Sequence, residues 1–141
     1  MLNSKQKGNL TEMQCMTSFL KLGYNVLIPF GDCERYDFVA DVKGCFLKIQ
    51  CKSASTKDDG ETILIECRST HYKEGHCIHE KYDKKQIDYI ATYWNNQCYL
   101  IPVEECGSAK KLRFNTPENY QKDRISFAKN YELEIVLNKF Y

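Results

Sequence analysis

The chain has 141 residues, of which 43% are hydrophobic and 28% are charged. This length and composition predict a single domain over residues 1–141 and exclude a disordered tail and a collagen. The 20 basic and 19 acidic side chains leave a net charge of +1, so nucleic-acid binding would require the fold to gather positive charge on one face.

The N-terminal half predicts one helix followed by three strands. Apolar residues recur near helical spacing along residues 3–22, namely Met13, Met16, Phe19 and Leu20. Gly23 follows them, which is typical of a helix end. Strands are predicted over residues 24–29, 36–42 and 45–52, with Lys43-Gly44 as the turn between the last two.

The second half predicts short strands with two further helices. In chain order we expect a loop over 53–60, a strand over 61–68, a loop over 70–81, a helix over 84–88 capped by Asp83, strands over 89–93 and 98–101, a helical turn over 103–106, a strand over 110–114, a helix over 123–130, and a strand or tail over 132–141. This order predicts an α/β (α+β) architecture in which helices flank one mixed central sheet.

Polar side chains alternate along the strand over 45–52, where burial alone does not explain them. Gln50 and Lys52 share one face of that strand because they are two residues apart. In a hairpin centred on Lys43-Gly44, Asp37 lies opposite about residue 50. Asp37, Gln50 and Lys52 should therefore cluster, and Glu12 lies beside the apolar stripe of the first helix.

These residue types suit phosphodiester cleavage. Carboxylates bind Mg²⁺ through oxygen, and the ion neutralises charge on the scissile phosphate and lowers the pKa of a bound water. A lysine beside it holds the attacking water or stabilises the developing charge. The amide oxygen of Gln50 can stand where a second carboxylate would otherwise be.

Several motifs together resemble the PD-(D/E)XK nuclease superfamily, and within it the small homing endonucleases associated with group I introns, whose Q-x-K variant replaces the usual acid. They are Lys7 to Glu12, Arg35-Tyr36-Asp37, Gly44, Ile49 to Ser53, Asp88 to Ala91, and Tyr99 to Pro102. The resemblance implies a restriction-endonuclease-like core and a Mg²⁺-dependent endonuclease, with Mn²⁺ as a possible substitute, that makes double-strand breaks in DNA.

The resemblance also implies roles for individual residues. Asp37 would be the central metal ligand, Glu12 an accessory ligand, Gln50 the replacement for the acid, and Lys52 the catalytic lysine. The backbone carbonyl of Cys51 would be a further metal ligand. Because one chain offers one active site and duplex DNA has two strands, we expect a homodimer or homotetramer.

Candidate DNA contacts lie around this site and in one basic run. Arg35, Tyr36 and Ser53 border the motif residues, and Lys7 lies on the first helix. Lys110, Lys111 and Arg113 form the densest basic run, which suits either a DNA-binding stripe or a solvated surface.

Other functions share these features. A Holliday-junction resolvase and a restriction or defence nuclease use the same core, and a catalytically inactive DNA-binding module is an alternative of a different class. A zinc-stabilised interaction domain would use His76, Cys77 and His79, but the eight cysteines contain no CxxC pair and suit free thiols better. The polar N-terminus and the absence of a run of roughly 20 apolar residues predict a cytoplasmic or nucleoid-associated protein without a membrane partner.

Overall fold

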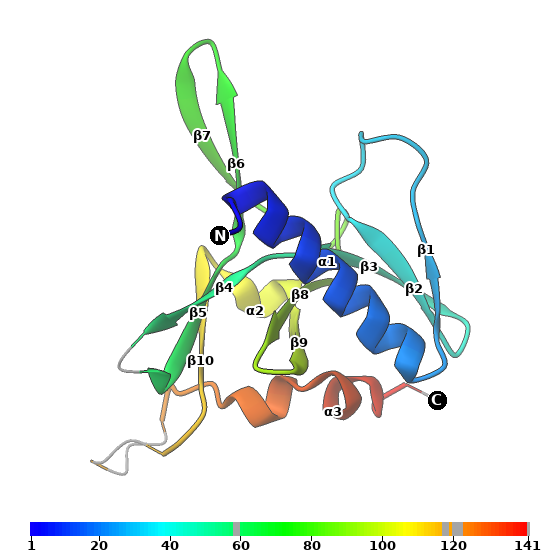
Figure 1. Cartoon of the computed structure of the whole chain (residues 1–141), viewed down its shortest axis with the longest axis vertical. Coiled ribbons are helices and arrows are strands. Elements are labelled where there is room, and N and C mark those ends of the chain that lie inside the picture. The colour runs from blue at the N-terminus through cyan, green and yellow to red at the C-terminus, as the bar shows by residue number, and fades with distance from the viewer. Residues whose placement is uncertain (58–59, 117–118, 120–122, 141) are drawn as a thin grey trace.

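A five-stranded sheet forms the centre of the structure, a computed structural model that describes residues 1–57, 60–116, 119 and 123–140 (Figure 1). Its strands are, in spatial order, β1 (Asn25–Leu27), β2 (Phe38–Val42), β3 (Cys45–Cys51), β8 (Tyr89–Trp94) and β9 (Gln97–Pro102). Only the β3–β8 pair is parallel, because the chain leaves the sheet after β3 and returns. The predicted mixed sheet and the α+β class are confirmed.

Helix α1 (Ser4–Lys21) packs against one face of this sheet. Asn3 begins the helix with a capping box, in which its side chain accepts from the Gln6 N–H at 2.9 Å. The buried side chains are Thr11, Cys15 and Phe19, which follow a spacing of four residues. The predicted apolar stripe was therefore partly wrong: Met13 and Leu20 are 60% and 55% exposed, since they lie on the outward face.

A second, three-stranded sheet covers the other face of the central sheet. Its spatial order is β10 (Ala109–Arg113), β5 (Thr62–Glu66) and β4 (Ala54–Lys57). Ile63 and Ile65 of β5 pack with Ile90 and Ile101 of the central sheet in a second core cluster. Strand β4 corrects the predicted loop over 53–60, because β5 supplies its hydrogen-bond partners although its own sequence is polar. Residues 58 and 59 of that segment lie outside the described residues.

The segment predicted as a loop over 70–81 is a β-hairpin. Strands β6 (Arg68–Lys73) and β7 (His76–Lys81) pair antiparallel and stand away from the rest of the molecule (Figure 1). The turn is Glu74-Gly75, where both residues have positive φ, of 52° and 78°. This conformation suits a two-residue hairpin turn. The sequence did not predict the hairpin, because its polar strands lack alternating apolar residues.

Two helices predicted in the second half of the chain, over 84–88 and 123–130, are not formed. Residues 84–86 instead form a turn, and Asp83 Oδ1 accepts from Lys85 N at 2.8 Å. The helix predicted over 123–130 is absent: residues 123–127 are irregular and a 3₁₀ turn spans Ala128–Tyr131. Instead, helix α3 (Leu133–Leu137) follows it and buries Leu133, Val136 and Leu137, so the predicted strand or tail over 132–141 is also corrected. Residue 141 lies outside the described residues.

The remaining predicted elements are present. The helical turn α2 (Val103–Cys106) follows Pro102, and β10 covers the strand predicted over 110–114. Among the described helices, none is both long and apolar enough to cross a membrane.

Candidate active site

Asp37 stands at the point where β2 begins to pair with β3. Its N–H donates to the Ile49 carbonyl at 2.8 Å, and Phe38 is the register partner of Ile49. Asp37 therefore lies opposite Gln50, as the turn at Lys43-Gly44 predicted. Asp37 Oδ2 accepts from the Cys51 N–H at 2.7 Å, so the backbone of β3 orients this carboxylate.

Gln50 and the Cys51 carbonyl lie beside that carboxylate. Gln50 Nε2 donates to the Cys51 backbone oxygen at 3.4 Å. The Cys51 side chain packs into the core on the α1 side of the sheet, whereas Gln50 lies on the opposite face of the same strand. The Cys51 backbone, rather than its thiol, therefore belongs to the site.

Lys52 is half-buried, and both its backbone N–H and its side-chain ammonium donate hydrogen bonds. Its N–H donates to the Ala91 carbonyl at 2.9 Å, and its Nζ donates to the Arg68 carbonyl at 3.1 Å. The ammonium also lies 5.4 Å from the centre of the Tyr82 ring. Burial lowers the pKa of Lys52, and the negative charge of Asp37 opposes this effect in part. Lys52 is thus a fixed amine that gives up its proton more readily than a surface lysine.

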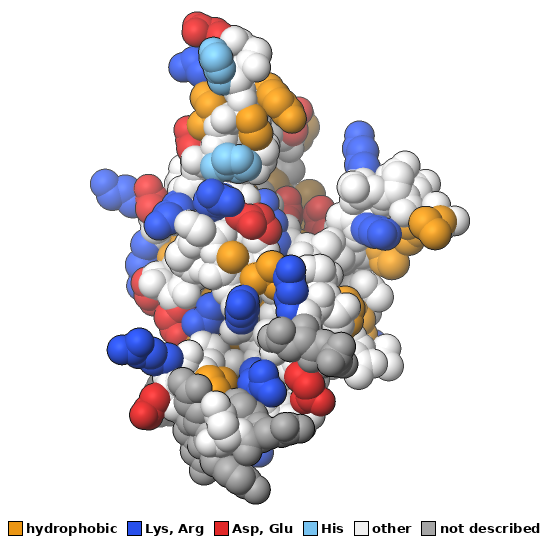
Figure 2. Space-filling model, turned by 90° about the vertical axis from the view of Figure 1, so that its left-hand side faces the viewer, with side chains coloured by type: hydrophobic (Ala, Val, Ile, Leu, Met, Phe, Trp, Pro, Cys, Tyr) orange, Lys and Arg blue, Asp and Glu red, His pale blue; other side chains and the backbone are white. Residues whose placement is uncertain are grey.

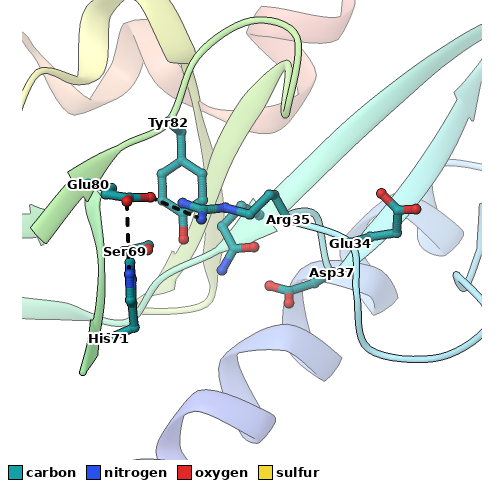
Figure 3. Close-up of a pocket in the computed structure, with 8 residues that line it drawn as sticks. Glu34, Arg35, Asp37, Ser69, His71, Glu80 and Tyr82 are labelled. Carbon is teal, nitrogen blue, oxygen red and sulfur yellow. Dashed lines mark ion pairs between the residues drawn. The ribbon is translucent and has the colours of Figure 1, made fainter. Parts of the chain in front are cut away.

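An open pocket of about 540 Å³ contains Asp37 and Gln50 (Figure 3). Its other lining residues come from the segment before β2 and from the projecting hairpin, and they are Glu34, Arg35, Ser69, His71, Glu80 and Tyr82. The sequence did not indicate that the hairpin residues belong to this site, because a segment predicted as a loop has no defined face.

Arg35 crosses this pocket with one nitrogen unsatisfied. Its Nη1 lies 3.6 Å from Glu80 and its guanidinium lies 4.8 Å from the Tyr82 ring centre (Figure 3). Its Nη2 is buried and has no hydrogen-bond partner among the described residues. A buried guanidinium N–H without an acceptor is costly, and an anionic oxygen that reached it would relieve this cost.

The other predicted DNA contacts are dispersed. Lys7 is exposed on α1, Ser53 contacts Thr11 through their hydroxyls at 3.1 Å, and Tyr36 packs against the second core cluster. The basic run on β10 is divided between two faces. Lys110 points to the core side, where its Nζ lies 5.3 Å from the Tyr131 ring centre, whereas Lys111 and Arg113 lie on the outer face.

Two carboxylates in the site influence each other. Burial raises the pKa of Asp37, although the Cys51 N–H and Lys52 both oppose this effect. Burial also raises the pKa of Glu12, and the charge of Asp37 raises it further. Glu12 is therefore close to Asp37, although it comes from α1 and does not line the pocket.

The donor groups at this place suit a hard divalent cation. Two carboxylates with raised pKa gain from a nearby positive charge, and the Gln50 amide and the Cys51 carbonyl add neutral oxygens. The described residues contain no cluster of three or more His, Cys, Asp and Glu side chains that could hold a metal ion. A bound ion would therefore depend on the neutral oxygens as well as on Asp37 and Glu12.

We predict that the pKa of Glu12 depends on Asp37. In the metal-free protein the Glu12 pKa should lie above that of an ordinary glutamate, and Asp37→Asn should lower it because the neighbouring negative charge is removed. Carboxyl ¹³C NMR titration of both proteins measures this. An unchanged Glu12 pKa in the variant would show that the two groups are too far apart to share an ion.

The alternative zinc site on the hairpin is not assembled. Cys77 and His79 share one face, with Cys77 Sγ 3.7 Å from His79 Nε2. His76 lies on the opposite face, since side chains alternate along a strand. His79 Nδ1 is also 3.0 Å from the Thr70 hydroxyl, so this strand does not bring the three predicted side chains together.

The chain is similar to known proteins along most of its length. The family model described as PD-(D/E)XK endonuclease matches residues 2–134. The solved structure of a bacterial homing endonuclease, I-Ssp6803I, is 27% identical in sequence and superposes with a TM-score of 0.77, covering 98% of this chain and 95% of that one. No curated protein matches the chain.

Proposed function

The chain belongs to the PD-(D/E)XK endonuclease family, and from this membership we propose that it is a Mg²⁺-dependent, site-specific DNA endonuclease of the homing type that makes double-strand breaks. The observation that supports this proposal most is that Asp37 and Gln50 line one open cleft with Arg35, while Lys52 lies close enough to Asp37 for their charges to interact. Similarity to a solved homing endonuclease favours that role over junction resolution. A DNA substrate would place the protein in the cytoplasm or at the nucleoid.

Asp37 and Glu12 would hold the cation, with the Gln50 amide oxygen and the Cys51 carbonyl as further ligands. A bound Mg²⁺, or Mn²⁺ in its place, would supply charge neutralisation at the phosphate and a more acidic water. The amide of Gln50 carries no charge, so the site has less negative charge than one with three acids. The ion would therefore be held more weakly.

The side chains of the protein perform the remaining tasks. Lys52 would hold the attacking water and stabilise negative charge on the phosphate, and its lowered pKa lets it take part in proton transfer. Arg35 would bind a phosphate oxygen through Nη2, which has no partner among the described residues. The ring of Tyr82 contacts both cations and stabilises their positions.

Further DNA contacts would come from the outer face of the β10-β5-β4 sheet. Lys57, Lys111 and Arg113 lie on this face according to the strand register. Figure 2 shows Lys and Arg side chains spread over this side of the molecule, with acidic ones between them and the histidines of the hairpin above. Lys7 on α1 and Ser53, which follows β3, would contact the DNA backbone. Tyr36 would support Arg35 from the core.

Two active sites are needed to cut both strands, so we propose a homodimer or homotetramer. The outward face of α1 offers apolar surface for this assembly, because Leu10, Met13 and Leu20 share one side of the helix and are 47%, 60% and 55% exposed. Sedimentation velocity of the purified chain measures the oligomeric state.

The test of the proposed function is cleavage of three substrates, namely a random-sequence plasmid library, the host locus from which the element that encodes the chain has been removed, and a four-way junction. We expect cleavage of linear DNA with Mg²⁺ and none with EDTA. Cutting of junctions alone would make the protein a resolvase. DNA binding without cutting in Mg²⁺ and in Mn²⁺ would make it an inactive binding module and overturn the proposal.

A further inference from the structure

The β6–β7 hairpin has no packing role that explains its presence. None of its twelve strand residues is buried, and only Arg68, Ser69 and Ile78 are partly covered. The hairpin extends away from both cores (Figure 1). An isolated two-stranded hairpin is marginally stable in water, so its side chains must serve a surface purpose.

One face of the hairpin continues the active-site pocket. The register pairs Ser69 with Glu80, His71 with Ile78, and Lys73 with His76, and directly paired side chains lie on the same face of a ladder. Three of these residues, Ser69, His71 and Glu80, line the pocket beside Asp37. We call this set of six residues the cleft face. It leads from the pocket to the hairpin tip, where Lys73 and His76 lie.

The base of the hairpin is tied to the segment that carries Asp37. Glu80 lies 3.6 Å from Arg35 Nη1 and 3.9 Å from His71 Nε2, and Arg35 stacks over Tyr82 (Figure 3). Lys52 also donates to the Arg68 carbonyl, at the start of β6. These contacts hold the cleft face at a fixed orientation to the place where the phosphate would be cut.

We propose that the cleft face of the β6–β7 hairpin enters the major groove of the substrate and reads base pairs next to the cut. This inference rests on the endonuclease function proposed above. The major groove is about 12 Å wide and admits a two-stranded β-ribbon, in which the strands are about 4.8 Å apart. Lys73, His76 and His71 offer the nitrogen groups that hydrogen-bond to base edges.

The geometry also limits which base pairs are read. Lys73 is four residues beyond Ser69, which corresponds to about 13 Å along a strand. Since DNA rises about 3.4 Å per base pair along each strand, this length spans about four base pairs. The positions that depend on the hairpin should therefore lie within about four base pairs of the scissile phosphate.

The test is to sequence the ends that the full-length protein produces from a random-sequence DNA library with Mg²⁺. Lys73→Ala combined with His76→Ala should weaken the base preference within about four pairs of the cut by about 5–150-fold per contacted position, since a good base contact discriminates by about 1–3 kcal/mol. The matched control combines His79→Ala with Lys81→Ala, which removes the same residue types from the opposite face. The control should keep the wild-type preference.

A second measurement does not depend on cleavage. Benzoylphenylalanine in place of His76 should crosslink to duplex DNA in EDTA, and the same group in place of His79 should not. The proposal would be overturned by crosslinking at position 79 alone, by crosslinking at neither position, or by equal effects of the two double variants on the base preference. So would a loss of self-association in the Lys73→Ala, His76→Ala protein, because the hairpin would then bind a second copy. Crosslinking of the position-76 variant, together with a wild-type protein that never cuts, would overturn only the nuclease function.

Discussion

Lys52→Ala is expected to lower the rate of DNA cleavage by at least about 10²–10³-fold, the usual effect of removing one group that stabilises transition-state charge. Lys52 follows β3 and lies close enough to Asp37 for the two charges to interact, and its Nζ is anchored on the Arg68 carbonyl at 3.1 Å. Single-turnover cleavage with saturating Mg²⁺ measures the chemical step. DNA affinity, measured with Ca²⁺ to prevent cutting, should remain near that of the wild type.

Lys48→Ala is the matched control for this prediction. Lys48 lies on the same face of β3, four residues earlier, but its Nζ donates to the Lys85 carbonyl at 2.6 Å outside the pocket. Its loss should leave the cleavage rate nearly unchanged. If Lys52→Ala weakened DNA binding as much as cleavage, or if both variants lost the same activity, Lys52 would be a binding residue and not a catalytic one.

Asp37→Asn is expected to have the largest effect, a loss of cleavage of about 10³-fold or more, because the charge stabilisation that a metal ion supplies amounts to several kcal/mol. The asparagine oxygen can still accept the Cys51 N–H, which donates to Asp37 at 2.7 Å. The variant therefore keeps the local backbone and removes only the charge. A loss of activity can then be attributed to the cation and not to a distorted strand.

Thermal stability provides a second readout for Asp37→Asn. The pKa of Asp37 is raised in the folded state, so its contribution to stability is fully present below the unfolded-state pKa and is lost as the pH rises through the folded-state pKa. At neutral pH without a cation, the variant should therefore have a higher Tm than the wild type. Mg²⁺ or Ca²⁺ should raise the Tm of the wild type, by mass action, but not that of the variant.

Asp41→Asn is the control for both readouts. Asp41 lies on β2, and its carboxylate accepts from the Gly44 N–H at 3.1 Å in the turn, a bond that asparagine retains. Its cleavage rate and its Tm increase with Mg²⁺ should match those of the wild type. A Tm increase that persisted in Asp37→Asn would contradict the assignment of Asp37 as the central metal ligand.

The predicted residues that the structure brings together at the candidate site share one property, which is that local geometry places them. The turn at Lys43-Gly44 sets the pairing of β2 and β3, so Asp37 falls opposite Gln50. Gln50 and Lys52 share a strand face because side chains alternate with a period of two. Short-range rules of this kind can be applied to a sequence directly, and for this reason the centre of the site and the mixed sheet were both predictable.

The faces of helices were harder to predict, because they depend on what packs against them. On α1 the sequence favoured a stripe through Met13 and Leu20, but the sheet covers Thr11, Cys15 and Phe19 instead. Phe19 meets Phe38 edge to face at 5.6 Å between ring centres. Glu12 adjoins this buried face, and its closeness to Asp37 follows from the way the helix lies on the sheet.

By itself the sequence determined the family, the hairpin that carries Asp37 and Gln50, and the position of Lys52. Only the tertiary structure decided that β6–β7 is a hairpin and that it closes one side of the pocket with His71, Glu80 and Tyr82. It also decided which face of β10 packs on the core, so that Lys110 lies on the inner face and Lys111 and Arg113 on the outer one. The physical reason is range. Alternation and turns act over a few residues, whereas this pocket depends on contacts between distant segments, because it is lined by residues 34, 35, 37, 50, 69, 71, 80 and 82.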